Sequence, residues 1–133
     1  LQTIVSRKIA RGAVAVKRGL SRRLVLGDLS ARVDWGYAPD YVEAMRAILA
    51  YKAPGDFVVA TGKAHSVRDF ARAAFSELGL NWRAWVRADP SVLTKRQPAL
   101  VGDARKLRRC TGWRPRTSFP EMVRALVLAE LER

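Results

Sequence analysis

Residues 57–79, FVVATGKAHSVRDFARAAFSELG, join an apolar run to an amphipathic segment. Residues 57–62 are too uniformly apolar for a half-exposed strand, so they predict a strand that is buried on both faces. Ser66 and Asp69 resemble a capping box, and the apolar residues behind them recur at helical spacing until Gly79. A strand that leads into a helix favours an α/β fold.

The same alternation extends in both directions along the chain. Apolar residues at helical spacing, with capping or stop residues, predict helices over residues 6–18, 39–52, 103–109 and from Ser118 towards the C-terminus. Residues 24–28 and 81–87 predict short strands, and residues 29–37 predict a loop or edge structure. The order of helices and strands indicates an α/β fold rather than an all-α fold.

The 133 residues carry a strong positive charge. Lys and Arg number 25 against 12 Asp and Glu, which gives a formal net charge of +13. Such an excess is typical of proteins that meet nucleic acid or another polyanion. The aromatic residues that would stack on bases lie mainly at core spacings, however, and a solvated basic face explains the charge equally well. We therefore do not expect nucleic acid as the main partner.

Cysteine and histidine usage excludes two further classes of protein. Cys110 is the sole cysteine and His65 the sole histidine, so neither a disulfide scaffold nor a Cys/His zinc site can form. No apolar run approaches the roughly 20 residues that cross a bilayer, and the first residues lack the order of a secretory signal. We expect a cytoplasmic chain that has no membrane partner.

Local motifs of catalysis are absent from the sequence. It contains no phosphate loop, glycine fingerprint, nucleophile elbow or paired-histidine motif. We therefore assign no catalytic, cofactor-binding or metal-binding residue to this chain.

The most specific pattern is LGDLSARVDWGYAPDYVEAM, residues 26–45. It resembles the segment Leu-Gly-Asn-Leu-Asp-Ala-Lys-Arg-Asp-Trp-Gly-His-Ala-x-Asp-Tyr-Val-Glu-Ala-Met of the GDP-mannose 4,6-dehydratases, which are extended short-chain dehydrogenase/reductases. Further pieces resemble the family in the same order: IVSRKIARG at residues 4–12, residues 56–80, and LVGDARKLRRCTGWRPRTSFPEMV at residues 100–123. The resemblance runs from about residue 4 onward and matches the C-terminal portion of such an enzyme.

The resemblance implies a reaction and a cofactor. In the family, a bound NADP takes a hydride from C4 of the sugar of GDP-mannose, water leaves across C5 and C6, and the hydride returns to C6. The glycine-rich dinucleotide loop and the Tyr-x-x-x-Lys pair of such enzymes lie upstream of the matched segment. The resemblance thus implies that this chain contributes to binding of GDP-mannose or a related nucleotide sugar and is inactive alone.

The resemblance also implies a division of the chain. Residues 1–37 and 63–133 would correspond to the substrate-binding part. Residues 38–62 would supply one helix and one strand to the Rossmann-type nucleotide-binding sheet. A chain that keeps these elements without their neighbouring strands would expose an apolar face, so we expect it to form homo-oligomers.

Substrate-binding residues follow from the same comparison. Lys8, Leu26 and Gly27 match positions that face the nucleotide sugar in the family. Arg32 lies one place before the diphosphate-binding Arg of the family, where this chain has Val33.

Other positions depart from the family pattern as well. Asp28 replaces Asn, Tyr37 replaces His, and the Arg-Pro-x-Glu motif falls on residues 93–96, where both its Arg and its Glu are lost. A second interpretation stays open at this point: a small basic protein that binds nucleic acid or an acidic partner.

Overall fold

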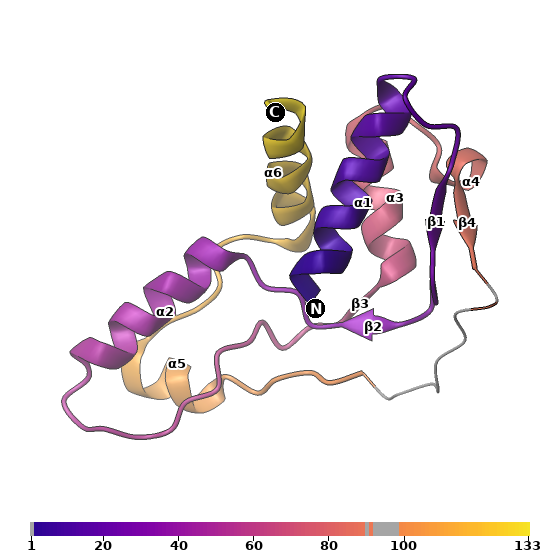
Figure 1. Ribbon diagram of the computed structural model, residues 1–133. Coiled ribbons are helices and arrows are strands. Elements are labelled where there is room, and N and C mark those ends of the chain that lie inside the picture. Colours follow the sequence, from indigo (N-terminus) through magenta and orange to yellow (C-terminus); the bar gives the residue numbers. More distant parts are fainter. Residues whose placement is uncertain (1, 90, 92–98) are drawn as a thin grey trace.

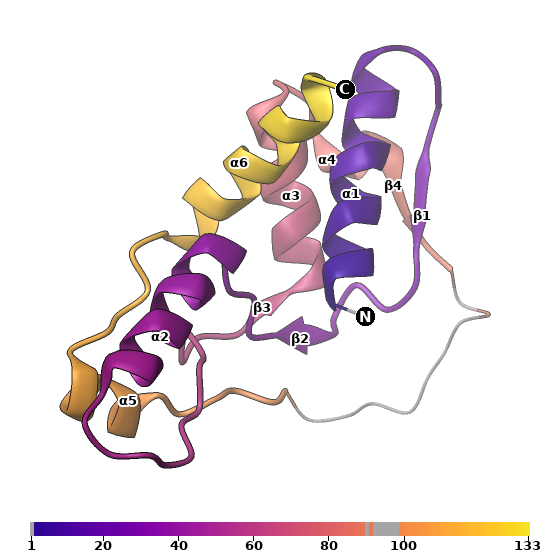
Figure 2. The ribbon, with the colours of Figure 1, turned by 60° about the vertical axis from the view of Figure 1, so that its left-hand side comes forward.

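The computed structural model describes residues 2–89, 91 and 99–133. Its helices form two groups, which Figures 1 and 2 show from two sides. One group, the helical core, consists of α1 (Gln2–Lys17), α3 (Val67–Glu77) and α6 (Phe119–Leu131), each of which contacts the other two. The other group pairs α2 (Ala38–Ala50) with α5 (Arg105–Thr111).

Short strands flank the helical core. β1 (Leu24–Leu26) pairs in parallel with β4 (Val86–Ala88), and β2 (Arg32–Val33) pairs antiparallel with β3 (His65–Ser66). Parallel strands need a crossover between them, and here it contains α3. The predicted α/β class is therefore confirmed.

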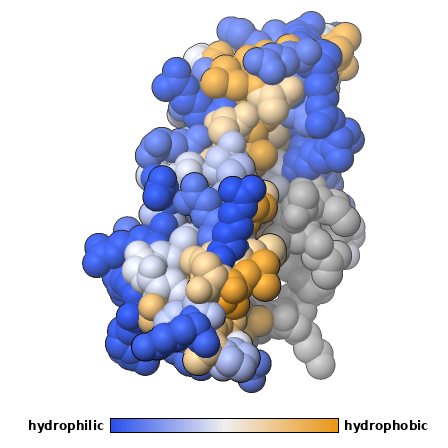
Figure 3. Space-filling view, turned by 90° about the vertical axis from the view of Figure 1, so that its left-hand side faces the viewer, coloured by the Kyte–Doolittle hydropathy of each residue, from blue (hydrophilic) through white to orange (hydrophobic). Residues whose placement is uncertain are grey.

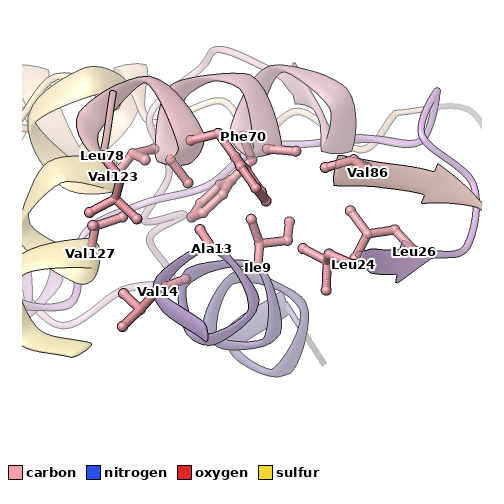
Figure 4. Packing of buried hydrophobic residues seen from close by; sticks show 14 of the residues in the cluster. Ile9, Ala13, Val14, Leu24, Leu26, Phe70, Leu78, Val86, Val123 and Val127 are labelled. Atoms are coloured by element: carbon pink, nitrogen blue, oxygen red, sulfur yellow. The ribbon is translucent and has the colours of Figure 1, made fainter. Parts of the chain in front are cut away.

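The helical core buries one continuous set of apolar side chains. Ile9 of α1 and Phe70 of α3 point toward each other between their helices (Figure 4), and Val123 of α6 is likewise fully buried. Burial of each such side chain contributes roughly 1.5–3 kcal/mol. A Cβ at Gly12 would lie 2.6 Å from Cδ1 of Leu24, so the glycine allows α1 to approach β1 closely.

Capping predictions are confirmed at α3 and α6. The Ser66 hydroxyl accepts a hydrogen bond from the Asp69 backbone N–H at 3.0 Å, and the Asp69 carboxylate accepts one from the Ser66 N–H at 3.0 Å. Ser118 and Glu121 make the same reciprocal pair before α6, at 3.3 Å in both directions. Each pair satisfies two N–H groups that have no partner within the first turn of a helix.

The predicted strand over residues 57–62 is wrong. These residues form an irregular segment, and no backbone pairing joins them to a strand in the described part of the chain. Phe57 and Val59 pack toward Ala44 of α2, whereas Val58 is 51% exposed. A strand requires a neighbour to pair its backbone, and apolar composition alone does not supply one. Burial on both faces is therefore not observed.

The strand predicted over residues 81–87 is partly wrong. α4 (Trp82–Trp85) occupies its first half, and β4 begins only at Val86. The side chain of Asn81 accepts a hydrogen bond from the Arg83 N–H at 3.1 Å, which starts a helical turn. The cap therefore outweighs the alternation of apolar and polar residues.

No helix in the part of the chain that the structure describes is both long enough and apolar enough to span a membrane.

Candidate functional site

Leu26 and Gly27 lie at the carboxyl end of β1, and Lys8 of α1 is near enough for its charge to act on Asp89 beside them. Lys8 is exposed on α1, and the backbone carbonyl of Leu26 accepts a hydrogen bond from the Asp89 N–H at 2.7 Å. The Leu26 side chain is only 3% exposed, so this residue can meet a ligand through its backbone alone. Gly27 follows directly and is half-buried.

Asp89 links this strand end to Lys8. Hydrogen bonds from the hydroxyl and the backbone N–H of Ser91, at 2.6 and 2.9 Å, lower the pKa of Asp89, and the charge of Lys8 lowers it further. The carboxylate is therefore ionised at neutral pH, and the charge of Lys8 acts on it without a direct ion pair in the described residues. We name Lys8, Leu26, Gly27 and Asp89 the strand-end site.

Arg32 makes its hydrogen bonds at the β2–β3 ribbon. Its guanidinium donates to the backbone carbonyl of Ala64 at 3.0 Å, and in the β2–β3 ribbon it is paired with Ser66. In the described part of the chain no hydrogen bond joins Arg32 to Lys8 or Leu26. Residues 93–96, where the Arg-Pro-x-Glu motif is lost, lie outside the described residues.

The sequence analysis missed Asp34, whose carboxylate connects its own segment to two others. Its carboxylate accepts hydrogen bonds from the Thr61 N–H and hydroxyl, the Gly62 N–H at 3.1 Å and the Gly102 N–H at 3.2 Å. These bonds hold two segments that are distant in sequence against the start of α2. A Cβ at Gly102 would lie 2.3 Å from that of Ala60, so only glycine fits there.

Asp40 makes a second connection of the same kind. This residue is 6% exposed, and its carboxylate accepts hydrogen bonds from the Thr117 N–H at 3.0 Å and the Thr117 hydroxyl at 3.3 Å. Trp113 donates its indole N–H to the Asp40 carbonyl at 3.0 Å. Neighbouring Tyr41 has a raised pKa because it is partly buried and lies near the carboxylates of Asp34 and Asp40.

Between the two helix groups lies a cavity of about 870 Å³, which we name the basic cleft. Its walls come from the segments that Asp34 and Asp40 hold in place. The lining residues include five cations and five aromatic rings: Lys63, Arg105, Arg108, Arg114, Arg116, Trp35, Tyr37, His65, Trp113 and Phe119. None of Lys8, Leu26, Gly27 and Arg32 lines the cleft. The molecule thus has two separate candidate sites.

Comparison with known proteins identifies the family. The model of the family described as GDP-mannose 4,6 dehydratase matches residues 1–126. The chain belongs to the GDP-mannose 4,6-dehydratase family. GDP-mannose 4,6 dehydratase 2 of Arabidopsis thaliana is 42% identical over 98% of this chain, and GDP-mannose 4,6 dehydratase of Homo sapiens is 36% identical over 96%. The alignments cover 35% and 39% of those relatives, so the chain spans well under half of their length.

Solved structures that contain a nicotinamide cofactor share the fold. RMD from Pseudomonas aeruginosa, solved with NADPH, superposes with a TM-score of 0.89 at 21% identity, covering 100% of this chain and 44% of that protein. UDP-glucose 4-epimerase from Bifidobacterium longum, solved with NAD+ and UDP, gives 0.80 at 15% identity, covering 97% and 39%. The chain therefore has part of an extended short-chain dehydrogenase/reductase fold, and both of these neighbours bind a nicotinamide cofactor.

Proposed function

We propose that this chain supplies the nucleotide-sugar-binding part of a GDP-mannose 4,6-dehydratase. The whole protein would convert GDP-mannose to GDP-4-keto-6-deoxymannose with NADP as its cofactor. The observation that carries the proposal is that the Leu26–Gly27 backbone ends a parallel strand beside Asp89, whose carboxyl pKa the charge of Lys8 lowers. Ligands of open α/β sheets bind beyond the carboxyl ends of the strands, and the strand-end site has that location.

The chemistry of the strand-end site suits a diphosphate. Lys8 presents an ammonium with donors that can reach more than one phosphate oxygen. A diphosphate would attract this ammonium more strongly than the single charge of Asp89 does, so the existing interaction is compatible with a ligand. Arg32 uses one of its N–H donors for the Ala64 carbonyl, and we include it as the outermost contact.

The division of the chain is part of the proposal. Residues 1–37 and 63–133 would form the substrate-binding part, and residues 38–62 would contribute to the nucleotide-binding sheet. Packing supports only the separation of α2 from the helical core, because Ala44 belongs to another hydrophobic cluster. Leu107 and Trp113 also belong to that cluster, so the boundary crosses a packed interface.

NADP does not fit the residues described here. No strand in residues 2–89, 91 and 99–133 leads through a glycine-rich turn into a helix, as a dinucleotide site requires. Within the proposal the cofactor, which would supply the hydride transfer, binds outside these residues. This chain's own role is to hold and orient the nucleotide sugar.

The alternative from the sequence, a basic protein that binds nucleic acid or an acidic partner, has no separate support. Arg105 and Arg108 of α5 line the basic cleft, whose volume suits a small molecule. A cytoplasmic location stays a prediction. It is supported by the presence of a single cysteine, since proteins of oxidising compartments commonly contain disulfides.

The proposal is tested by calorimetry with GDP. Lys8→Ala should weaken GDP binding by about 1–3 kcal/mol, the usual loss for a hydrogen bond to a charged group. Lys17→Ala is the matched control, since Lys17 is exposed at the other end of the same helix. Equal affinity of the Lys8→Ala variant and the unchanged chain, or no binding to either, would contradict the proposal.

A further inference from the structure

The basic cleft has the size and the wall chemistry of a ligand site. Its volume of about 870 Å³ falls within the range of roughly 300–1,000 Å³ that small-molecule sites occupy. It lies between the helical core and the α2–α5 pair, and residues from both groups line it. The hydrogen bonds to Asp34 and Asp40 fix its walls, so the cleft is formed before any ligand enters.

Positive charge remains unpaired in the cleft. The guanidinium of Arg105 is bound to Asp103 at 2.8 Å, and that of Arg116 lies 3.4 Å from Glu43. Lys63, Arg108 and Arg114 have no ion pair within residues 2–89, 91 and 99–133. Glu121 also lines the cleft, but it accepts the Ser118 N–H in the cap of α6. The cleft therefore favours an anion with more than one negative charge.

One wall of the cleft is aromatic. The His65 ring stacks on Phe119 with centroids 3.9 Å apart and planes inclined by 9°. The centroid of the Trp35 ring lies 6.0 Å from that of Phe119. Nδ1 of His65 and Nε1 of Trp35 are buried without a hydrogen-bond partner in the described part of the chain. Buried polar atoms without partners are rare in proteins, and both of these belong to residues that line the cleft.

We propose that the basic cleft binds a phosphate monoester that carries an aromatic group, at a place separate from the strand-end site. The phosphate meets the guanidinium groups of Arg108 and Arg114, which match phosphate oxygens in pairs. The ring of the ligand lies against the His65–Phe119 stack. The phosphate of the ligand thus meets the cationic part of the cleft, and its ring meets the aromatic part.

The experiment titrates the full chain with phenyl phosphate, inorganic phosphate and phenol by calorimetry. Phenyl phosphate should bind more tightly than either of the other two compounds, because only it fills both parts of the cleft. Arg114→Ala and Arg108→Ala should each weaken its binding by about tenfold or more, since each removes a charge-assisted hydrogen bond. Arg46→Ala is the control, because Arg46 is exposed on α2 and does not line the cleft.

Lys8→Ala separates this site from the strand-end site. This substitution should leave the affinity for phenyl phosphate unchanged. The expected result is the same whether or not GDP binds at Lys8, so the two proposals are tested independently. Absence of phenyl phosphate binding would overturn the inference. Binding that Lys8→Ala weakens but the two arginine variants do not would place the anion at the strand-end site, which would overturn it equally.

Discussion

The indole N–H of Trp113 donates to the backbone carbonyl of Asp40 at 3.0 Å, across 73 positions of sequence. The Asp40 carboxylate meanwhile accepts the N–H and the hydroxyl of Thr117. One residue of α2 thus binds both ends of the segment that leads from α5 to α6. This connection sets how the α2–α5 pair lies against the helical core, and with it the shape of the basic cleft.

Removal of the Asp40 carboxylate should destabilise the protein. Asp40→Ala leaves the Thr117 N–H without its partner in a part-buried position, which costs about 1–3 kcal/mol in the free energy of unfolding. Urea denaturation measures the change. Glu43→Ala serves as control, because its exposed ion pair with Arg116 contributes at most about 1 kcal/mol. Equal stability of Asp40→Ala and the unchanged chain would refute this role of Asp40.

A methyl group at Gly102 should disrupt the contact between residues 60 and 102. Gly102→Ala places a Cβ 2.3 Å from that of Ala60, and overpacking of this kind costs about 1–3 kcal/mol. Gly55→Ala is the matched control, since its nearest heavy atom would be Nζ of Lys106 at an ordinary 3.6 Å. Thermal unfolding should show a lower Tm for Gly102→Ala than for Gly55→Ala. The opposite order would mean that the two segments are not packed together.

The outer face of α2 should make the chain self-associate. Val42, Met45 and Leu49 recur at helical spacing on it and are 47%, 58% and 86% exposed. Figure 3 shows hydrophobic surface on the lower half of the face where α2 and α5 lie. Because contiguous apolar patches favour association, sedimentation should detect oligomers, and the dye ANS should bind.

Met45→Lys tests whether this face causes the association. The substitution should reduce both dye binding and the oligomeric fraction, because it adds charge to the centre of the patch. Lys52→Ala, beyond the end of the helix, is the control. A monomer that binds no dye would show that the exposed face does not associate.

The isolated chain should have no dehydratase activity with GDP-mannose and added NADP. The reason is chemical: its 133 residues contain no dinucleotide fingerprint and no Tyr-x-x-x-Lys, so hydride transfer lacks a carrier site. Chromatography of the reaction mixture measures the product. GDP-4-keto-6-deoxymannose above the level of a protein-free control would disprove this expectation.

Local signals in the sequence predicted local structure well. The caps at Ser66 and Ser118 depend on residues three positions apart, and both form as expected. Residues 57–62 failed because a strand depends on a distant partner, which an apolar run does not encode. Residues 82–85 failed because the Asn81 cap acts within one turn, whereas the alternation that favoured a strand is a weaker signal.

The candidate sites were predictable to a lesser degree. Family resemblance pointed to Lys8, Leu26 and Gly27, of which Leu26 and Gly27 lie at one strand end and Lys8 acts on the charge of Asp89 there. Asp34 was missed because its role depends on backbone N–H groups that only the folded chain brings near it. Asp89 was missed because its N–H donates to the carbonyl of Leu26, which lies far away in the sequence. The Asp-Pro pair at residue 89, directly after a predicted strand, is the signal that could have drawn attention to Asp89.

Backbone-amide NMR during a titration with GDP-mannose tests the central claim most directly, because it locates the ligand without requiring activity. Binding at the strand-end site predicts shifts that saturate together at Lys8, Gly27 and Asp89, while the amide of Arg46 on α2 stays unchanged. Lys8→Ala should reduce these shifts at the same ligand concentration. An unchanged spectrum, or shifts confined to residues that line the basic cleft such as Gly102, would contradict the account.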